Sequence, residues 1–334
     1  MKKILVTGGA GYIGSVATYL LLQKAYEVVV IDNFSTGHEE VLKFFNTKYP
    51  KNFKYYKADL QKRETIKEAL DKEKEFDAVL HYAASCLVNE SMENPAKYFT
   101  NNVIGSQNLF SELIEHSIKN IVFSSTCAVY GEAQYVPVDE KHPTNPANPY
   151  GESKRMIELM LQWYGKLGKL NYVILRYFNV CGASDDGEVG DSKDPSVLLM
   201  QNAVRGALGI ESFYLTCPEV DTPDKTPIRD YINVVDLNEA HLGALDYLIN
   251  GGKSEIINLG TGTGNSVLEI VTTVEKITGK KLDRKKTEAR KGEYAKMIAD
   301  TSKAKTVLGW EPKRTISDSV NSLVKWYKNH PQGW

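Results

Sequence analysis

The first 32 residues carry the feature that most limits how this chain can fold. A short apolar run, residues 3–7, leads into the turn GGAGYIG at residues 8–14, and a helical pattern begins near Tyr12. Glycines permit a tight turn and let backbone N–H groups approach a pyrophosphate, and the start of a helix adds partial positive charge. A second strand-like run then ends at Asp32, 18 residues past Gly14. This pattern predicts a β-α-β unit that binds a dinucleotide.

Residues at or just after the ends of the second, third and fourth strand-like runs indicate which dinucleotide is bound and how. A carboxylate at Asp32 suits the two hydroxyls of the adenosine ribose and repels a 2′-phosphate. No arginine follows within residues 33–38, so we predict NAD rather than NADP. Asp59 is placed either to accept a hydrogen bond from the adenine amino group or to cap the helix that follows it. Ala83 and Ala84 have small side chains, which fits close packing against a cofactor.

Strand-like and helical patterns alternate through the first half of the chain. The strand-like runs are 3–7, 27–32, 53–58, 78–82, 121–125 and 172–178, and the helical ones are 15–24, 62–73, 101–116 and 151–166. This order predicts an α/β fold, a Rossmann-type doubly wound parallel sheet with a smaller C-terminal substrate domain. Two further helical patterns, 237–248 and 267–278, flank a strand-like run at 255–259. We predict an NAD-binding domain over 1–178 and a substrate domain over 179–334, with about 232–262 returning to the first.

Composition argues against several other classes of protein. The 334 residues have a formal net charge of −1, which disfavours nucleic acid or an anionic membrane as the main partner. No apolar run approaches the ~18–20 residues of a membrane span, and the run after Met1 is too short for a signal peptide. The four cysteines and six histidines are dispersed, so we predict no disulfide and no metal site. We therefore expect a cytoplasmic protein with a small-molecule substrate.

Tyr150 and Lys154 are the candidate catalytic pair. Four residues apart on a helix, they share a face, so the lysine ammonium can favour the ionised form of the phenol. A free tyrosine titrates near pKa ~10, too high for a base at neutral pH. Most such pairs are solvated side chains, but the dinucleotide turn upstream favours a functional pair. Ser124, Ser125 and Thr126 close the fifth strand, where ligands bind in open parallel sheets, and a hydroxyl there is expected to bridge the substrate hydroxyl and Tyr150, although small polar residues also end many strands.

Several further motifs resemble a known family. They are FSST at 123–126, VYG at 129–131, NPYGESK at 148–154, LRYFN at 175–179 and IRDYI at 228–232. Together with the N-terminal turn they are similar to the extended short-chain dehydrogenase/reductase family. The runs around Arg176 and Arg229 more narrowly resemble its UDP-galactose (UDP-glucose) 4-epimerases, and the resemblance continues to residues 308–310.

The resemblance implies an NAD-dependent 4-epimerase of a nucleotide sugar. The Tyr150 phenolate would take the proton of the sugar 4-OH, and Lys154 would lower the Tyr150 pKa and hold the nicotinamide ribose. Hydride would pass from sugar C4 to NAD, the 4-keto intermediate would turn over, and hydride would return to the opposite face. Relatives also pair the patterns at 101–116 and 151–166 across a twofold axis, which implies a homodimer, although either apolar stripe could instead pack on its own sheet.

The resemblance also implies a set of binding residues. For the cofactor they are Gly8, Gly11, Tyr12, Ile13, Gly14, Asp32, Asn33, Thr36, Gly37, Asp59, Leu60, Tyr82, Ala83, Ala84, Cys86, Asn101, Thr126, Tyr150, Lys154 and Phe178. For the substrate they are Thr126, Tyr150, Asn179, Arg229, Tyr231, Arg290, Glu293 and Met297.

Departures from the family pattern leave the sugar nucleotide open. They lie at 194–198, at 215–218, at 224–226 and at Cys86, where nucleotide and sugar contacts are expected. The alternatives are UDP-N-acetylhexosamine, UDP-pentose or UDP-uronate 4-epimerases, or a decarboxylase. A 4,6-dehydratase is disfavoured, because Cys127 and Ala128 stand where dehydratases carry an Asp-Glu pair. A non-catalytic NAD-binding regulator would be expected to lack Tyr150 or Lys154. Met297 is expected to border the C2 substituent of the sugar, or else to be a core residue.

Overall fold

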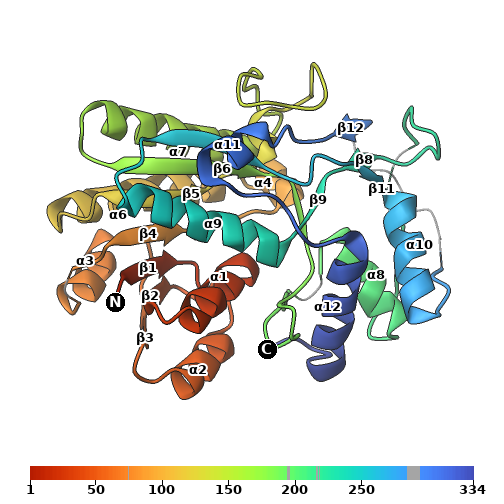
Figure 1. Ribbon diagram of the computed structural model, residues 1–334, viewed down its shortest axis with the longest axis horizontal. Coiled ribbons are helices and arrows are strands. Elements are labelled where there is room, and N and C mark those ends of the chain that lie inside the picture. Colours follow the sequence, from red (N-terminus) through yellow and green to blue (C-terminus); the bar gives the residue numbers. More distant parts are fainter. Residues whose placement is uncertain (74, 194–195, 216, 218, 284–293) are drawn as a thin grey trace. The chain divides into compact units, whose positions relative to one another are not determined.

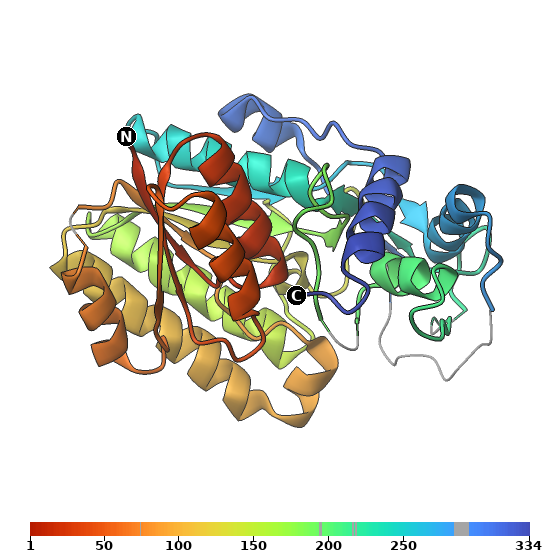
Figure 2. The same cartoon turned by 90° about the horizontal axis from the view of Figure 1, so that it is seen from below.

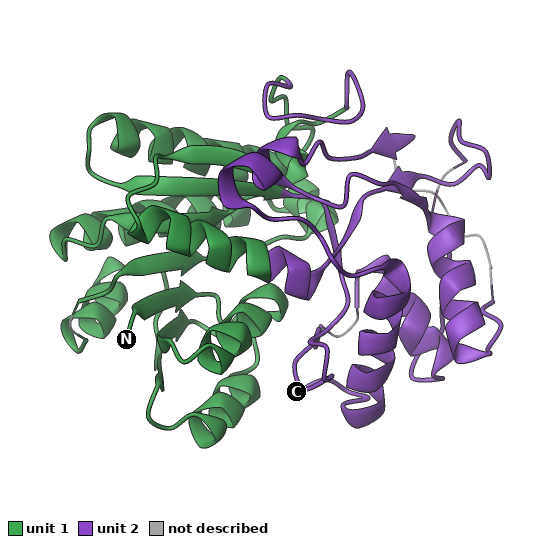
Figure 3. Cartoon of the chain, in the orientation of Figure 1, with its two compact units in different colours: residues 1–132, 143–176, 239–257 green, residues 133–142, 177–238, 258–334 purple. Residues whose placement is uncertain are grey.

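The computed structural model describes residues 1–73, 75–193, 196–215, 217, 219–283 and 294–334. It divides the chain into two compact units (Figure 3). Unit 1 comprises 1–132, 143–176 and 239–257, and unit 2 comprises 133–142, 177–238 and 258–334. The assignment of cofactor and substrate to separate domains, with limits at 178 and 179, stays a prediction. Within the described residues, every helix is too short or too polar to cross a membrane.

A seven-stranded sheet of strand order β10-β6-β5-β4-β1-β2-β3 forms the centre of unit 1 (Figure 1). Its strands are β1 (Lys3–Thr7), β2 (Glu27–Asp32), β3 (Phe53–Lys57), β4 (Ala78–His81), β5 (Asn120–Ser124), β6 (Asn171–Tyr177) and β10 (Glu255–Leu259). The pairings from β3 across to β6 are parallel, so the carboxyl ends of these strands share one edge. The Rossmann-type parallel sheet predicted from the sequence is confirmed.

Helices cover both faces of this sheet. The helical segments around the sheet are α1 (Tyr12–Gln23), α2 (Glu39–Lys48), α3 (Arg63–Asp71), α4 (Val88–Glu93), α5 (Pro95–Tyr98), the π-helix η1 (Phe99–Ile104), α6 (Gly105–Glu115), the 3₁₀ helix η2 (Cys127–Val129), α7 (Pro149–Lys166) and α9 (Val234–Ile249). One face packs against α3, α6 and α7 in a core that includes Ile66, Phe110 and Ile157. The other face lies under α1 and α9 (Figures 1 and 2).

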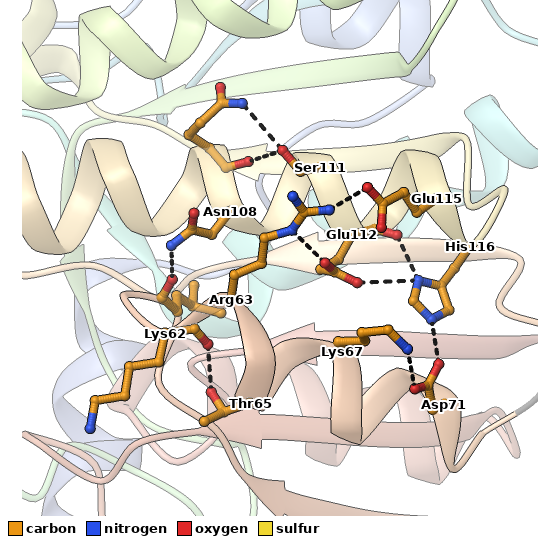
Figure 4. A network of polar contacts seen from close by, with 12 residues as sticks. Lys62, Arg63, Thr65, Lys67, Asp71, Asn108, Ser111, Glu112, Glu115 and His116 are labelled. Atoms are coloured by element: carbon orange, nitrogen blue, oxygen red, sulfur yellow. Dashed lines mark hydrogen bonds and ion pairs between the residues drawn. The ribbon is translucent and has the colours of Figure 1, made fainter.

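Ion pairs reinforce the contact between α3 and α6 (Figure 4). Arg63 of α3 donates to Glu112, with Nε 2.5 Å from Oε1, and its guanidinium also pairs with Glu115. His116, directly after α6, lies with Nε2 3.1 Å from Oδ1 of Asp71 at the end of α3. These contacts hold the two helices side by side on one face of the sheet.

Unit 2 contains two small sheets and a helical cluster. Its elements are the strands β7 (Asn179–Cys181), β8 (Ile228–Arg229), β9 (Tyr231–Asn233), β11 (Asn265–Ser266) and β12 (Lys296–Met297), and the helices α8 (Leu199–Ala207), α10 (Val267–Thr278), α11 (Ser302–Leu308) and α12 (Ile316–Asn329). The sheets have the orders β11-β8-β12 and β7-β9. Apolar side chains of α8, α10 and α12 pack into one core around Trp326.

Candidate active site

The turn between β1 and α1 uses its glycines in two ways. A Cβ atom on Gly8 would lie 2.6 Å from the backbone nitrogen of Ala83, and one on Gly14 would overlap the carbonyl oxygen of Gly8. Close packing therefore requires glycine at both positions. Gly11 differs, because a Cβ there would meet Gly8 at an ordinary 3.5 Å and its φ is −84°. Glycine at this helix start leaves the backbone uncovered, which fits the approach of a pyrophosphate to the first N–H groups of α1.

Asp32, at the end of β2, is folded against the same turn. Its carboxylate accepts hydrogen bonds from the backbone N–H groups of Ala10 at 3.0 Å and Phe34 at 2.8 Å. Burial raises the pKa of this carboxyl, and those N–H donors oppose the rise. Gly37 closes the loop, since a Cβ there would lie 2.8 Å from Ala10. The structure thus brings the predicted ribose-binding acid and the glycine-rich turn together.

The predicted cofactor residues after β3 and β4 also lie at the carboxyl edge of the sheet. The Asp59 carboxylate accepts from Gln61 N–H at 3.0 Å, whereas α3 begins at Arg63 with Lys62 as its N-cap. The alternative that Asp59 merely caps this helix is therefore wrong, and its contact with adenine stays a prediction. After β4, the backbone N–H of Ala83 donates to Thr7 Oγ1 at 3.3 Å, so this loop is tied to β1.

The start of α7 places the predicted base against the end of β5. The side chain of Asn148 caps the helix by accepting from Gly151 N–H at 2.8 Å. Glycine is required at 151, because a Cβ there would lie 2.6 Å from the carbonyl oxygen of Ala128. Thr126 caps η2 by accepting from Ala128 N–H at 3.1 Å. Tyr150 is 8% exposed and Thr126 is 7% exposed, so both side chains stand in largely desolvated surroundings.

Lys154 is the most deeply buried member of the predicted catalytic set, with 2% of its surface exposed. Its ammonium group donates to the carbonyl oxygen of Ser124 at 2.8 Å and lies 4.8 Å from the centre of the Phe123 ring. Burial lowers the pKa of Lys154 to about 8. A cation that titrates this close to neutrality shares a helix face with Tyr150, which is the arrangement needed to tune a phenol. The effect of Lys154 on the Tyr150 pKa stays a prediction.

Sequence reasoning missed a buried network that joins the cofactor loops to α7. His81 Nδ1 lies 2.7 Å from Thr7 Oγ1, and its Nε2 lies 2.9 Å from Ser106 Oγ. Burial and the nearby charge of Lys154 lower the His81 pKa to about 3, so the ring is neutral. The position of His81 at the end of an apolar run was the one signal in the sequence that could have indicated this network.

The same network continues through η1. The amide of Asn102 donates to Ser153 Oγ at 3.0 Å, and Ser153 donates to the carbonyl oxygen of Tyr150 at 2.7 Å. Asn102 also accepts from Ser85 N–H at 2.8 Å, in the loop that contains Cys86. The neighbouring Asn101 donates to Ser85 Oγ at 3.2 Å. The π-helix therefore ties the loop after β4 to the helix that carries Tyr150.

Four of the predicted substrate residues form two adjacent pairs within unit 2. Asn179 of β7 pairs in register with Tyr231 of β9, and Arg229 of β8 pairs with Met297 of β12. Phe178, a predicted cofactor residue, precedes β7 and is buried. The remaining substrate residues, Arg290 and Glu293, lie outside the described residues, as do positions 194, 195, 216 and 218 among the departures from the family pattern.

Comparison with known proteins identifies the family. Residues 4–260 match the model of the NAD dependent epimerase/dehydratase family. The chain belongs to this family. It is 40% identical to the UDP-glucose 4-epimerase of Lactobacillus helveticus over 99% of both chains. It is also similar to the crystal structure of UDP-glucose 4-epimerase from Bifidobacterium longum in complex with NAD+ and UDP, with a TM-score of 0.94, 33% identity and full coverage of both chains. A third similar structure is the UDP-Glc/GlcNAc 4-epimerase from Campylobacter jejuni, with a TM-score of 0.83, 37% identity and coverage of 98% of this chain and 100% of that one.

In this member of the epimerase/dehydratase family, a buried ion pair anchors α7 one turn beyond Lys154. Glu158 accepts from Arg176 of β6, with Oε2 2.5 Å from Nη2 and Oε1 3.0 Å from Nε. It also accepts from Ser125 Oγ at 2.6 Å, and Arg176 reaches the hydroxyl of Tyr130 at 3.1 Å. Glu158 lies four residues after Lys154, so it extends the same buried face of the helix. The spacing 150, 154, 158 was the signal that could have found it.

The depressed pKa of Lys154 predicts how stability of the NAD-free protein changes with pH. Between about pH 8 and the ordinary pKa near 10.5, the unfolded chain binds a proton at Lys154 that the folded chain does not. Folding is therefore favoured as pH rises through this window, by roughly 3 kcal/mol in full. We expect Lys154→Met to remove this dependence and to be more stable than wild type at pH 7.

The measurement is urea unfolding of wild type and Lys154→Met at pH 7, 9 and 10, with the difference in unfolding free energy taken at each pH so that other groups cancel. Lys166→Met, at an exposed lysine of the same helix, is the matched control and should follow wild type at every pH. A constant difference between wild type and Lys154→Met across the series would contradict the prediction.

Proposed function

We propose that this protein is an NAD-dependent UDP-glucose 4-epimerase that interconverts UDP-galactose and UDP-glucose. The observation that carries the proposal is the buried Tyr150 and Lys154 face at the carboxyl end of β5, in a chain whose full-length relatives are named UDP-glucose 4-epimerases. Tyr150 beside Lys154 provides a proton acceptor, and the names of the relatives indicate which reaction it serves. Cys127 and Ala128 follow Thr126, which argues against the elimination step of a dehydratase.

The residues around the β1–α1 turn fit NAD. The uncovered backbone at Gly11 suits a pyrophosphate, and the carboxylate of Asp32 suits a ribose diol and repels a 2′-phosphate. When bound, NAD supplies the hydride acceptor and donor for carbon C4 of the sugar. Asp32, the turn at residues 8–14 and the loop containing Ala83 would hold it. Lys154 would hold the nicotinamide ribose.

The side chains then divide the remaining work. Tyr150 removes the proton from the sugar 4-OH during oxidation and returns it during reduction, with Thr126 holding that hydroxyl in place. Lys154 keeps the phenolate accessible at neutral pH. Arg229, with Asn179 and Tyr231, would grip the nucleotide diphosphate while the sugar turns over. The hydride taken from C4 and the proton taken from the 4-OH are both returned to the sugar, so no net oxidant or reductant is consumed.

The direct test uses the protein without added cofactor. Purified protein is incubated with UDP-galactose, UDP-GlcNAc and UDP-xylose separately, and the products are resolved by chromatography. We expect UDP-glucose from UDP-galactose, and NAD as the nucleotide released on denaturation. NADP as the dominant nucleotide, or no epimerisation of UDP-galactose after NAD is added, would contradict the proposal.

Substrate scope provides a second prediction, centred on Met297. This residue is 6% exposed and pairs with Arg229, and we propose that it borders the C2 substituent of the sugar. An unbranched methionine adapts its shape more readily than a tyrosine ring does. We therefore expect wild type to accept UDP-N-acetylhexosamines less efficiently than UDP-hexoses, and Met297→Tyr to lose the N-acetyl activity alone.

The comparison is kcat/KM for UDP-galactose and for UDP-N-acetylgalactosamine in wild type and Met297→Tyr. Met297→Leu, which nearly conserves side-chain volume, is the control and should keep both activities. Equal losses for both substrates in Met297→Tyr would show that this residue is a core residue and not a boundary of the sugar site.

We further propose a cytoplasmic homodimer. On α7, Met156, Leu159 and Trp163 are exposed apolar residues at spacings of three and four, and Leu167 follows the helix end; Trp163 is 62% exposed. Such a stripe on one helix face fits a second copy of the chain. All four cysteines are free thiols, which supports a reducing compartment.

Light scattering tests the dimer. Wild type should have twice the 37.4 kDa mass of one chain at micromolar concentration, and Trp163→Glu should shift it towards one chain because a buried charge opposes the interface. Lys51→Glu, an exposed charge reversal between α2 and β3, should leave the mass unchanged. A wild-type mass of one chain would contradict the proposal.

A further inference from the structure

Asp230 is a fully buried carboxylate between β8 and β9 in unit 2. Its Oδ1 accepts from both the backbone N–H and the hydroxyl of Thr261, each at 2.7 Å. Its Oδ2 accepts from the backbone N–H groups of Gly262 at 3.0 Å and Ala299 at 3.2 Å. One side chain thus gathers two segments that are distant from it in the sequence.

The backbone of Asp230 joins two more segments. Its N–H donates to the carbonyl oxygen of Met297 at 3.1 Å, and its carbonyl oxygen accepts from Asn179 N–H at 2.9 Å. At this residue the chain leaves the sheet β11-β8-β12 and enters the pair β7-β9. The residues on either side of Asp230 pair with different strands: Arg229 pairs with Met297 of β12, and Tyr231 pairs with Asn179 of β7.

The chemistry of this junction differs from that of a second buried aspartate in the same unit. The described partners of Asp230 are uncharged N–H and O–H donors. Asp236 is equally buried, but it pairs with the guanidinium of Arg314 and accepts from the backbone of residues 313 and 314. Burying a carboxylate without a cation is costly unless every oxygen is hydrogen-bonded in good geometry.

The surroundings of Asp230 meet that requirement closely. A Cβ atom on Gly260 would lie 2.5 Å from Oδ2, so glycine lets the segment before Thr261 close over the carboxylate. A strand crossover by itself needs no buried charge, and an apolar residue would fill it at lower cost. A carboxylate with four converging donors instead fixes the direction of each strand that it joins.

We infer that Asp230 is a positioning residue for nucleotide-sugar binding, which holds Arg229, Tyr231 and Asn179 in one fixed arrangement toward the nucleotide diphosphate. This inference rests on the proposed function. It places no contact between Asp230 and the substrate. Its consequence is that loss of the carboxylate loosens three ligand-binding side chains together, whereas the β1–α1 turn and Asp32 of the cofactor site lie on other strands and keep their geometry.

The test is Asp230→Asn in the full-length holoenzyme. An amide presents one oxygen and one NH₂ where the site offers four donors, so one pair of bonds is lost. We expect the Kd of UDP, measured by calorimetry, to rise on the order of 10-fold or more. The KM for UDP-galactose should rise by a larger factor than kcat falls, and NAD content should stay at the wild-type level.

Asp236→Asn is the matched control, because it removes an equally buried carboxylate from the same unit. It should lower the thermal midpoint while leaving the Kd of UDP within about twofold of wild type. If Asp230→Asn does not fold, Thr261→Val removes one donor from Oδ1 and should weaken UDP binding several-fold, and Thr261→Ser should restore it.

Three outcomes separate the alternatives. An unchanged Kd of UDP in Asp230→Asn, or in Thr261→Val where that variant is used, overturns the inference. Equal weakening of UDP binding by Asp236→Asn also overturns it, because the effect would then be general to a damaged unit. A wild-type protein that neither binds UDP nor epimerises UDP-galactose overturns the proposed function itself, before any variant is compared.

Discussion

Tyr150→Phe is expected to lower epimerase turnover by ~10²-fold or more while the protein stays folded and keeps its NAD. The substitution removes the phenol oxygen but keeps the ring. That ring is 8% exposed and lies edge-on to Tyr98, with centroids 6.4 Å apart, so phenylalanine fills the same space. The loss should fall on kcat, because proton transfer is needed in the chemical step and not in binding the nucleotide.

The measurement compares kcat, the Kd of UDP and NAD content between wild type and the variant. Tyr164→Phe is the matched control. Tyr164 lies near the other end of the same helix. Its hydroxyl accepts from Gln107 Nε2 at 2.8 Å. It should keep turnover within about twofold of wild type. Near-normal turnover in Tyr150→Phe would remove Tyr150 from the role of base.

The parallel sheet was predictable because its central strands are apolar on both faces. Runs such as Val28–Ile31 are β-branched, and β-branched residues favour extended backbone and pack well between layers of helices. The limits of β1, β2, β10 and α10 were predicted to the residue. The other strands and helices of the predicted sheet unit shifted by one to four residues at their ends, where caps and fraying decide the limit.

Several helices and short strands of the structure were not predicted. The helices α2, α8 and α12 were not anticipated, although Thr315 and Asp318 form a capping box at the start of α12 that was readable from the sequence. Strands of two or three residues, such as β8 and β12, are too short to show alternation. The π-helix η1 overlaps the start of the predicted run 101–116, which a regular helical pattern also fits.

The predicted catalytic residues were found from motif and spacing, but their supports were not. Tyr150 and Lys154 follow from an i, i+4 relation behind a dinucleotide turn. Asn102, His81 and Glu158 are polar residues, and their residue type does not show that they are buried in a hydrogen-bonded network. Their burial depends on which helix faces which strand, and that is decided by tertiary packing and not by local pattern.

Glu158→Gln is expected to destabilise the protein by about 3–5 kcal/mol. The substitution keeps the shape of the side chain and a carbonyl oxygen for Ser125. It leaves the guanidinium of Arg176, whose side chain is 5% exposed, without its counter-charge in a dry environment. Because this pair ties α7 to β6, we also expect turnover to fall more than NAD content as the position of Tyr150 loosens.

The measurement is the free energy of unfolding in urea, with Lys67→Gln as the control. Lys67 and Asp71 form an ion pair whose side chains are 55% and 50% exposed, and breaking it should cost less than about 1 kcal/mol. The double variant Glu158→Gln with Arg176→Met removes both charges and should recover part of the lost stability, since no unpaired cation remains buried. If Glu158→Gln unfolds at the wild-type urea concentration, the ion pair contributes nothing to anchoring α7, and the position of the proposed base must depend on Asn102 and Ser153 instead.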